Sequence, residues 1–154
     1  MLKAIRQGRR EDGFTLIELM VVVMIIAILI AIAIPSFLGF RRNAQDRSVQ
    51  SDLRNVLLAE NAYQLENNAF TADDAALLEI EANARLDAIT VNLLGDDVCL
   101  DGTSESSHTF AVYQIGEGAT YYTLGTDGVC PAAAAVPGAG WSQTGWGAAE
   151  VVVP

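Results

Sequence analysis

The sequence predicts an α+β fold in which a long N-terminal α-helix packs against a small antiparallel β-sheet. Three observations carry this prediction. An apolar run covers residues 13–34, apolar residues at helical spacing continue from 41 to about 67, and short β-forming segments follow. With 154 residues, of which 51% are hydrophobic, the chain has room for one modest domain and one membrane segment. A multidomain enzyme is therefore not expected.

The apolar run, GFTLIELMVVVMIIAILIAIAI, contains a single charged residue, Glu18, near its start. An ionised carboxylate inside a bilayer costs about 2.5 to 3.5 kcal/mol even on mild insertion scales, so this acid needs a partner or a purpose. No Lys or Arg lies between Arg10 and Arg41 to serve as that partner. The stretch from Phe14 to Phe40 would be roughly 40 Å long as a helix, which is enough to span a membrane with some tilt.

This start differs from a cleavable signal peptide, which has an apolar stretch of about 7 to 15 residues and then a small-residue cleavage site. No such site follows the longer run here, so we expect it to remain in the protein. Basic residues stand both before the run and after it, and the positive-inside rule therefore does not settle the orientation. The acidic body and the cysteines favour a C-terminus outside the cell.

The net charge and the two cysteines indicate the character of the chain beyond the apolar run. The net charge is -10, although four basic residues lie within the first thirteen, so the body is strongly acidic and nucleic-acid binding by it is not expected. Cys99 and Cys130 are the two cysteines, and they stand far apart in polar, Gly-rich sequence. In an exported domain they predict one disulfide. Two unpaired thiols are the alternative.

From residue 41 the helix is expected to continue as an amphipathic one to about Asn67. Its apolar face comprises Val49, Leu53, Val56, Leu57, Glu60 and Tyr63. Its expected exposed positions carry Arg42, Asp46, Arg47, Asp52 and Arg54. A short second helix is expected to begin at residues 71–74 and to run to Ile80, because Thr and Asp there match a helix start.

Strands are expected at residues 88–94, 109–115 and 120–124, with a turn at 116–118. After Cys130 the chain is rich in Gly and Ala and should be largely irregular, with residues 151–153 as a possible edge strand. We expect Trp141 and Trp146 to cover the sheet.

Little in the sequence points to catalysis or to a cofactor. His108 is the sole histidine and is expected at the surface, so neither a His-based metal cluster nor a Cys/His nucleophile is supported. The acids Asp96, Asp97, Asp101 and Glu105 are interpreted as an acidic loop. This loop fails the EF-hand pattern because Cys99 and His108 stand where oxygen ligands belong. We therefore predict no metal, and calcium binding stays a lesser alternative.

The segment GFTLIEL, preceded by a short basic leader and followed by an unbroken apolar run, resembles the type IV pilin and pseudopilin family. In that family a prepilin peptidase cuts after the glycine, here Gly13, and N-methylates the new first residue, here Phe14. The resemblance also implies that Glu18 is needed for methylation and for docking a subunit into a filament. It identifies Pro35 as the helix proline found in many members. The match is close in the leader and first helix, whereas the remainder is similar only in architecture.

The resemblance divides the chain into a leader at 1–13, a transmembrane and filament-core helix at 14–40, its amphipathic continuation at 41–67 and an exported domain at 68–154. Cleavage would create a cationic amine at Phe14, which could pair with Glu18 in the same helix or in a neighbour and set the register. The simpler alternative is an acid that only caps the helix. Pro35 is expected to kink or loosen the helix at residues 34–39, unless it is an incidental membrane proline.

The function expected from these residues is that of a pilin, a structural subunit without catalytic activity or cofactor. Its partners would be copies of itself, the prepilin peptidase, the pilus or secretion machinery and, before assembly, the lipid bilayer. The precursor is expected in the cytoplasmic membrane and the filament at the cell surface. One alternative is a type II secretion pseudopilin or a minor competence pilin, and another is a membrane-anchored exported binding domain or enzyme. The sequence leaves open adhesion, motility or DNA uptake as the end use.

Overall fold

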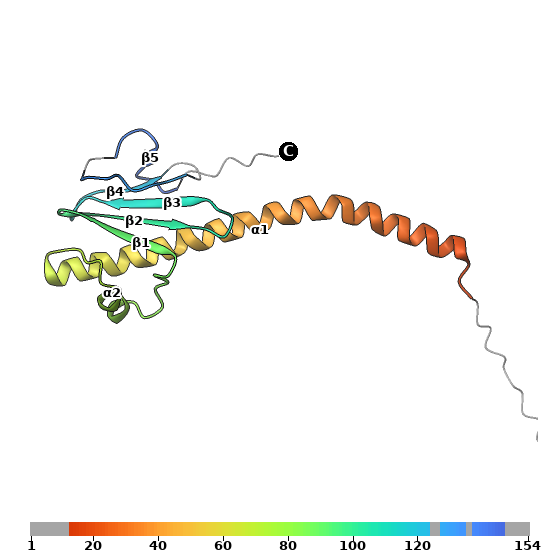
Figure 1. Ribbon diagram of the computed structural model, residues 1–154, viewed down its shortest axis with the longest axis horizontal. Coiled ribbons are helices and arrows are strands. Elements are labelled where there is room, and N and C mark those ends of the chain that lie inside the picture. Colours follow the sequence, from red (N-terminus) through yellow and green to blue (C-terminus); the bar gives the residue numbers. More distant parts are fainter. Residues whose placement is uncertain (1–12, 124–126, 135–136, 147–154) are drawn as a thin grey trace, which may run out of the picture. The chain divides into compact units, whose positions relative to one another are not determined.

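The computed structural model describes residues 13–123, 127–134 and 137–146 (Figure 1). In chain order its elements are α1 (Leu16–Asn67), α2 (Asp74–Ile80), β1 (Ile89–Leu94), β2 (Asp97–Thr103), β3 (Thr109–Gln114), β4 (Thr120–Thr123) and β5 (Trp141–Ser142). A long helix followed by a small antiparallel sheet confirms the predicted α+β fold. The leader before Gly13 and the possible strand at 151–153 lie outside the described residues.

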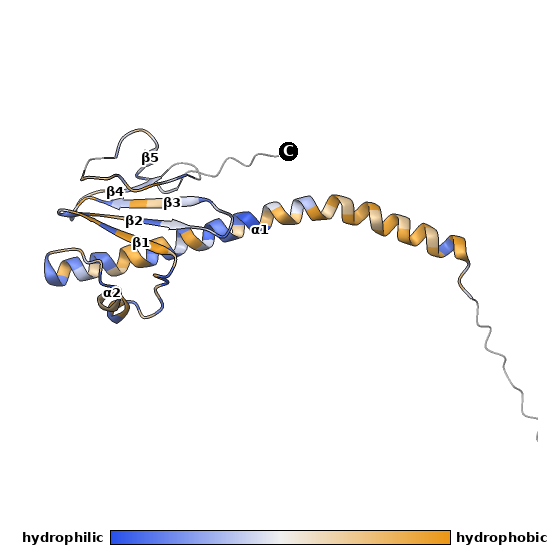
Figure 2. Cartoon of the chain, in the orientation of Figure 1, coloured by the Kyte–Doolittle hydropathy of each residue, from blue (hydrophilic) through white to orange (hydrophobic). Residues whose placement is uncertain are grey.

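Contacts within the chain define two units, one ending at Phe40 and one beginning at Arg41, and α1 contributes residues to both. Its residues are almost uniformly hydrophobic in the first unit and mixed in the second (Figure 2). The helix ends at Asn67, as the sequence predicts. Asn68 follows with a φ of 53°, a left-handed conformation that Asn adopts more readily than most residues.

The second helix begins where the Thr and Asp residues predict it. Asp73 is the N-cap of α2, and its Oδ1 accepts a hydrogen bond of 3.0 Å from the Ala75 N–H. Leu77 is fully buried and anchors the helix to the core, whereas the neighbouring residues of α2 face solvent wholly or in part.

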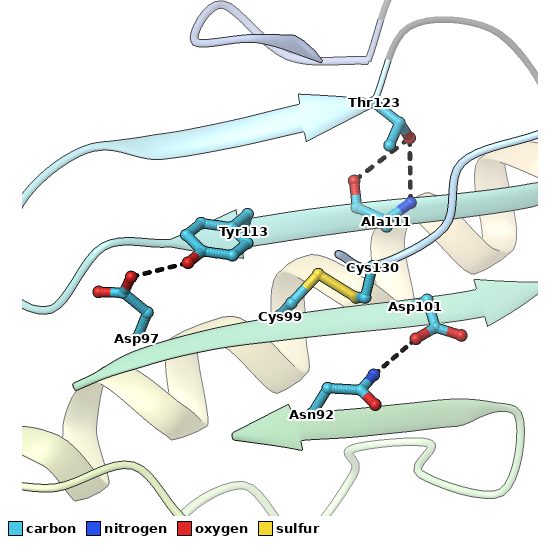
Figure 3. Close-up of a disulfide and its surroundings, with 8 residues drawn as sticks. All are labelled: Asn92, Asp97, Cys99, Asp101, Ala111, Tyr113, Thr123 and Cys130. Atoms are coloured by element: carbon cyan, nitrogen blue, oxygen red, sulfur yellow. Dashed lines mark hydrogen bonds between the residues drawn. A yellow bond between two sulfur atoms is a disulfide. The ribbon is translucent and has the colours of Figure 1, made fainter. Parts of the chain in front are cut away.

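The five strands form one antiparallel sheet in the order β1-β2-β3-β4-β5, so each strand pairs with the next along the chain. Three of them, β1, β3 and β4, occupy predicted segments. The interpretation of Asp97 and Asp101 as part of an acidic loop was wrong, because both residues lie in β2. Each acid accepts a 2.7 Å hydrogen bond from a neighbouring strand, Asp97 from the Tyr113 hydroxyl and Asp101 from the Asn92 amide (Figure 3). These partners make carboxylates tolerable inside a sheet.

The main core forms where helical residues cover one face of the sheet. Side chains of β3 alternate between the two faces, so those of Phe110 and Val112 join the helices while those of Ala111 and Tyr113 lie on the opposite face. The fully buried members of the core are Leu53, Val56, Leu77, Val98, Leu100, Phe110 and Val112. This core belongs to the unit that begins at Arg41, and it fixes the second half of α1 to the sheet.

Cys130 and Trp141, which follow β4, cover the opposite face, whereas Trp146 packs against the main core. Cys99 in β2 forms the predicted disulfide with Cys130, 31 residues later (Figure 3). Closing a loop of this length stabilises the fold by about 3 to 4 kcal/mol in the chain-entropy model. Trp141 packs edge-on against Tyr113, with 6.2 Å between ring centroids. It therefore covers the sheet as expected, although the short strand β5 that contains it was not predicted.

Candidate assembly site

The residues just before α1 form an exposed peptide bond outside regular secondary structure. Gly13 and Phe14 precede the helix, and Phe14 exposes 81% of its surface. A Cβ added to Gly13 would meet no atom within 4 Å, so the fold itself does not require glycine here.

Thr15 caps the N-terminus of α1. Its Oγ1 accepts a 3.2 Å hydrogen bond from the Glu18 N–H, and its carbonyl oxygen accepts one of 3.2 Å from the Leu19 N–H. A Thr followed three residues later by Glu has the spacing of a capping box, a signal in the sequence that was missed at Thr15. The cap fixes the backbone of Glu18 in the first turn, where the helix dipole favours a carboxylate.

The helix that follows this cap presents hydrophobic side chains on every side. All residues from 13 to 44 are exposed in the isolated chain, and residues 19–26 are an unbroken run of exposed large hydrophobic side chains. Among the described residues, α1 is the one helix long and apolar enough to cross a membrane, with a mean hydropathy of 3.2 over an 18-residue window. A helix that is hydrophobic all round is typical of a membrane span or of a helix buried among other helices.

Glu18 has no cation partner in its own chain as far as the structure describes it. The single ion pair among the described residues joins His108 to Asp46. The sequence has no Lys or Arg between Arg10 and Arg41, so the hydrophobic start of α1 itself supplies no cation for Glu18.

A polar cluster centred on Asp46 joins α1 to the connection between β2 and β3. Asp46 Oδ1 accepts hydrogen bonds from Ser104 Oγ at 2.7 Å and from Ser106 Oγ at 2.5 Å. Its Oδ2 lies 2.8 Å from Nδ1 of His108. Burial alone would raise the pKa of Asp46, but these hydrogen bonds and the imidazole charge outweigh it and place the pKa below its ordinary value.

The expectation of an exposed Asp46 was wrong, because only 4% of the residue is exposed. The signal was available: Asp46 precedes Val49 by three positions and Leu53 by seven, so it shares their face of the helix. His108 lies partly at the surface, with 35% of its side chain exposed, and its Nδ1 is 2.8 Å from Asp46 Oδ2.

The cluster contains Ser, His and Asp, but its hydrogen bonds do not have the pattern of a nucleophilic triad. In a triad the hydroxyl bonds to one nitrogen of the imidazole and the acid bonds to the other. Here the hydroxyl groups of Ser104 and Ser106 bond to the carboxylate instead. This arrangement supports a structural role, in which Asp46 holds the loop against the helix.

Glu60 is a second buried acid in α1. Its residue surface is fully buried, and its Oε2 accepts a 3.1 Å hydrogen bond from the Thr71 N–H. Its Oε1 has no hydrogen-bond partner among the described residues. Burial raises the pKa of Glu60 to about 7, although the bond from Thr71 opposes this shift. Glu60 thus connects α1 to the segment before α2, although burial disfavours its charged form.

Other predicted site residues are spread along the chain. Pro35 lies inside α1, where it lacks the N–H that would donate to the Ala31 carbonyl, and the kink stays a prediction. Glu105 accepts a 2.7 Å hydrogen bond from the Gln45 amide. Within the described part of the chain, no group of three or more His, Cys, Asp or Glu side chains could hold a metal ion.

Residues 8–34 match the family described as "Prokaryotic N-terminal methylation motif". The chain is 43% identical over 72 residues to the "Type IV wide pilus major component PilA4" of Thermus thermophilus, a match that covers 47% of this chain and 55% of that protein. It is 37% identical over 70 residues to the "Type IV major pilin protein PilA" of Myxococcus xanthus, covering 46% of this chain and 32% of that protein. It is 35% identical over 71 residues to the "Type II secretion system core protein G" of Aeromonas hydrophila, covering 46% of this chain and 50% of that protein.

These matches span about half or less of the relatives' own length. The methylation motif nevertheless includes Gly13, Phe14 and Glu18, the residues that form the exposed, capped start of α1. The long apolar helix and the small antiparallel sheet agree with the same assignment. The chain thus carries the N-terminal methylation motif and is similar, over about half of its length, to type IV pilins and to core protein G of type II secretion systems.

Proposed function

We propose that this chain is a structural subunit of a type IV pilus, which polymerises through its N-terminal helix into a surface filament. The observation that carries the proposal is the apolar start of α1, which is exposed on every side and holds a single acid, Glu18, in its first turn. Relatives named as pilus components, at 43% and 37% identity, support it. The subunit would have no catalytic activity, and its hydrophobic helix would exchange lipid contacts for contacts with other copies.

In this proposal the precursor lies in the cytoplasmic membrane with its C-terminus outside. A prepilin peptidase cleaves between Gly13 and Phe14, and Phe14 is then N-methylated. Two observations support these steps: the bond is exposed, and the fold does not need the glycine. The Cys99–Cys130 disulfide supports an oxidising location for the unit that contains it.

Cleavage creates an α-amine at Phe14, whose ordinary pKa is near 8, so it is largely protonated at neutral pH. In the filament this cation pairs with Glu18 of a neighbouring copy and fixes the axial register, much as a buried polar pair fixes the register of a coiled coil. Pro35 and Gly39 allow the helix to loosen at residues 34–39 as subunits leave the bilayer.

Replacement of Glu18 tests the proposal. Glu18→Ala should leave the protein in the membrane and lower the yield of sheared filaments at least tenfold, because the amine then lacks its counter-charge. Glu66→Ala, which removes an exposed acid from the last turns of α1, is the matched control and should leave the yield unchanged. Normal piliation of the Glu18→Ala strain would exclude the register role. The N-terminal mass of filament protein should correspond to methylated Phe14, whereas a membrane-anchored enzyme or binding protein would keep its leader.

A second candidate function is that of a pseudopilin in a type II secretion system. The 35% identity to core protein G of Aeromonas hydrophila favours it. Deletion of the gene separates the two functions. Loss of surface filaments with normal secretion would identify a pilin, whereas accumulation of exported enzymes in the periplasm would identify a pseudopilin.

A further inference from the structure

The solvent-facing side of α1 in the unit beginning at Arg41 carries basic and hydrophobic side chains. Arg47, Arg54, Leu58 and Leu65 stand at positions i, i+7, i+11 and i+18, so they share one face of the helix. All four are exposed, Leu58 by 67% and Leu65 by 75%. Arg54 also lies 4.7 Å from the ring centroid of Trp146, which holds its charge in place along this face. We call these four residues the basic face.

The solvent-facing side of α2 carries the opposite charge. Asp74 and Glu79 are exposed, and between and beside them Leu78 exposes 40% and Ile80 exposes 37% of its surface. Only Leu77 of this helix is buried in the core. Asp74 and Leu78, four residues apart, share one side of the helix, whereas Glu79 and Ile80 project from other sides because consecutive residues are turned by about 100°. We call Asp74 and Leu78 the acidic face.

We propose that the basic face of one copy binds the acidic face of the next copy, so that α1 of one subunit packs on α2 of its neighbour. This inference rests on the proposed function, because it needs copies to assemble. The occupant is a second copy because the complement of each face, in charge and in hydrophobic content, is present on the same chain.

The spacing of the side chains agrees with this pairing. Arg54 and Leu58 are four residues apart, as are Asp74 and Leu78, and such pairs lie about 6 Å apart on a helix. When the two helices align in parallel, Arg54 faces Asp74 while Leu58 packs on Leu78. The ion pair sets the register and the hydrophobic pair excludes water.

The two faces differ, so the contact is heterologous. A bound pair has an unused basic face at one end and an unused acidic face at the other. Further copies therefore add at both ends, and the pair does not close into a dimer. The pairing therefore extends an open array, as a filament requires. It involves residues outside the hydrophobic start of α1, and it would give the exported parts of neighbouring subunits a defined alignment.

Disulfide cross-linking on intact filaments tests the contact. The native cysteines are both consumed by the Cys99–Cys130 bond, so introduced cysteines are the only free thiols. Filaments of the double variant Leu58→Cys/Leu78→Cys should give a ladder of multimers after mild oxidation. Every subunit then carries one thiol on each face and can form a disulfide with both of its neighbours. Leu58→Cys and Leu78→Cys chains expressed together as single variants should give dimers only. The double variant Leu58→Cys/Leu93→Cys is the matched control and should stay monomeric, since Leu93 is exposed on β1.

Three results would overturn the inference: filaments without the ladder, dimers from Leu58→Cys alone, or equal cross-linking of the control. Wild-type cells without filaments would instead defeat the proposed function.

If the cysteine variants assemble poorly, exchange of the paired charges tests the contact instead. Arg54→Glu and Asp74→Lys should each lower the filament yield about tenfold, and the combined variant should restore it. A combined variant no better than either parent would contradict the pairing.

Discussion

The two halves of α1 share one helix but bury their hydrophobic residues against different partners. Residues 16–40 are hydrophobic all round, and every one of them is exposed in the isolated chain. Residues 41–67 have a single hydrophobic stripe, and Leu53 and Val56 within it are fully buried under the chain's own sheet. The second half is therefore covered by folding, whereas the hydrophobic residues of the first half stay exposed. Substitutions in the two halves should report on different processes.

The acids of the two halves differ in the same way. Glu18 is exposed and has no cation partner among the described residues of its own chain. Asp46 and Glu60 are buried and accept hydrogen bonds from residues outside the helix. Trp141 and Trp146 both lie in the unit beginning at Arg41, so their fluorescence can follow the unfolding of this unit in the detergent-solubilised full chain.

The largest effect is expected from a pair of identical substitutions, one in each half. Leu53→Ala should lower the free energy of unfolding by about 3 kcal/mol, because it opens a cavity in the core. Leu29→Ala should leave that free energy unchanged, since Leu29 is 61% exposed and makes no core contact, but it should weaken filaments. Denaturant titration of both variants checks this. Equal destabilisation of the fold would contradict the division of α1.

The next effect is a pH dependence due to Glu60. Its pKa is about 7 in the fold against an ordinary 4.5, so between these values the native chain keeps a proton that the unfolded chain releases. The unfolding free energy should therefore fall by about 3 kcal/mol as the pH rises from 4.5 to 7. Glu60→Gln should remove most of this fall and be more stable than the wild type at pH 8. Glu66→Gln, at an exposed position, should change nothing, and parallel pH profiles for wild type and Glu60→Gln would refute the prediction.

A smaller effect is expected at Asp46. Asp46→Ala should cost about 2 kcal/mol at pH 7, because the buried Ser104 hydroxyl loses its acceptor. The lowered pKa of Asp46 means that its contribution is present above the ordinary value of 3.8 and is lost as the pH falls below it. His108→Ala, at the half-exposed end of the cluster, should cost about 1 kcal/mol. The control is Asp52→Ala, which removes a partly exposed acid from the same helix and should be nearly neutral in the same titration.

Local patterns in the sequence were enough for most of the helical part. Apolar spacing placed the end of α1 at Asn67, and Thr and Asp residues marked the start of α2. The motif at Gly13, Phe14 and Glu18 identified the candidate assembly site, because its residues are close together in the sequence. These features depend on interactions between residues a few positions apart, which periodicity and capping preferences describe directly.

The sequence by itself thus determined the order of the main elements, the cysteine pair and the N-terminal motif. Tertiary structure alone decided that β2 is a strand, in which Asp97 and Asp101 accept hydrogen bonds from Tyr113 and Asn92 of the neighbouring strands. It also decided which partners meet the buried Asp46, since these residues lie 58 to 62 positions away. The physical reason is that the cost of burying a polar group depends on the partners that meet it in space, and no local pattern reveals those partners.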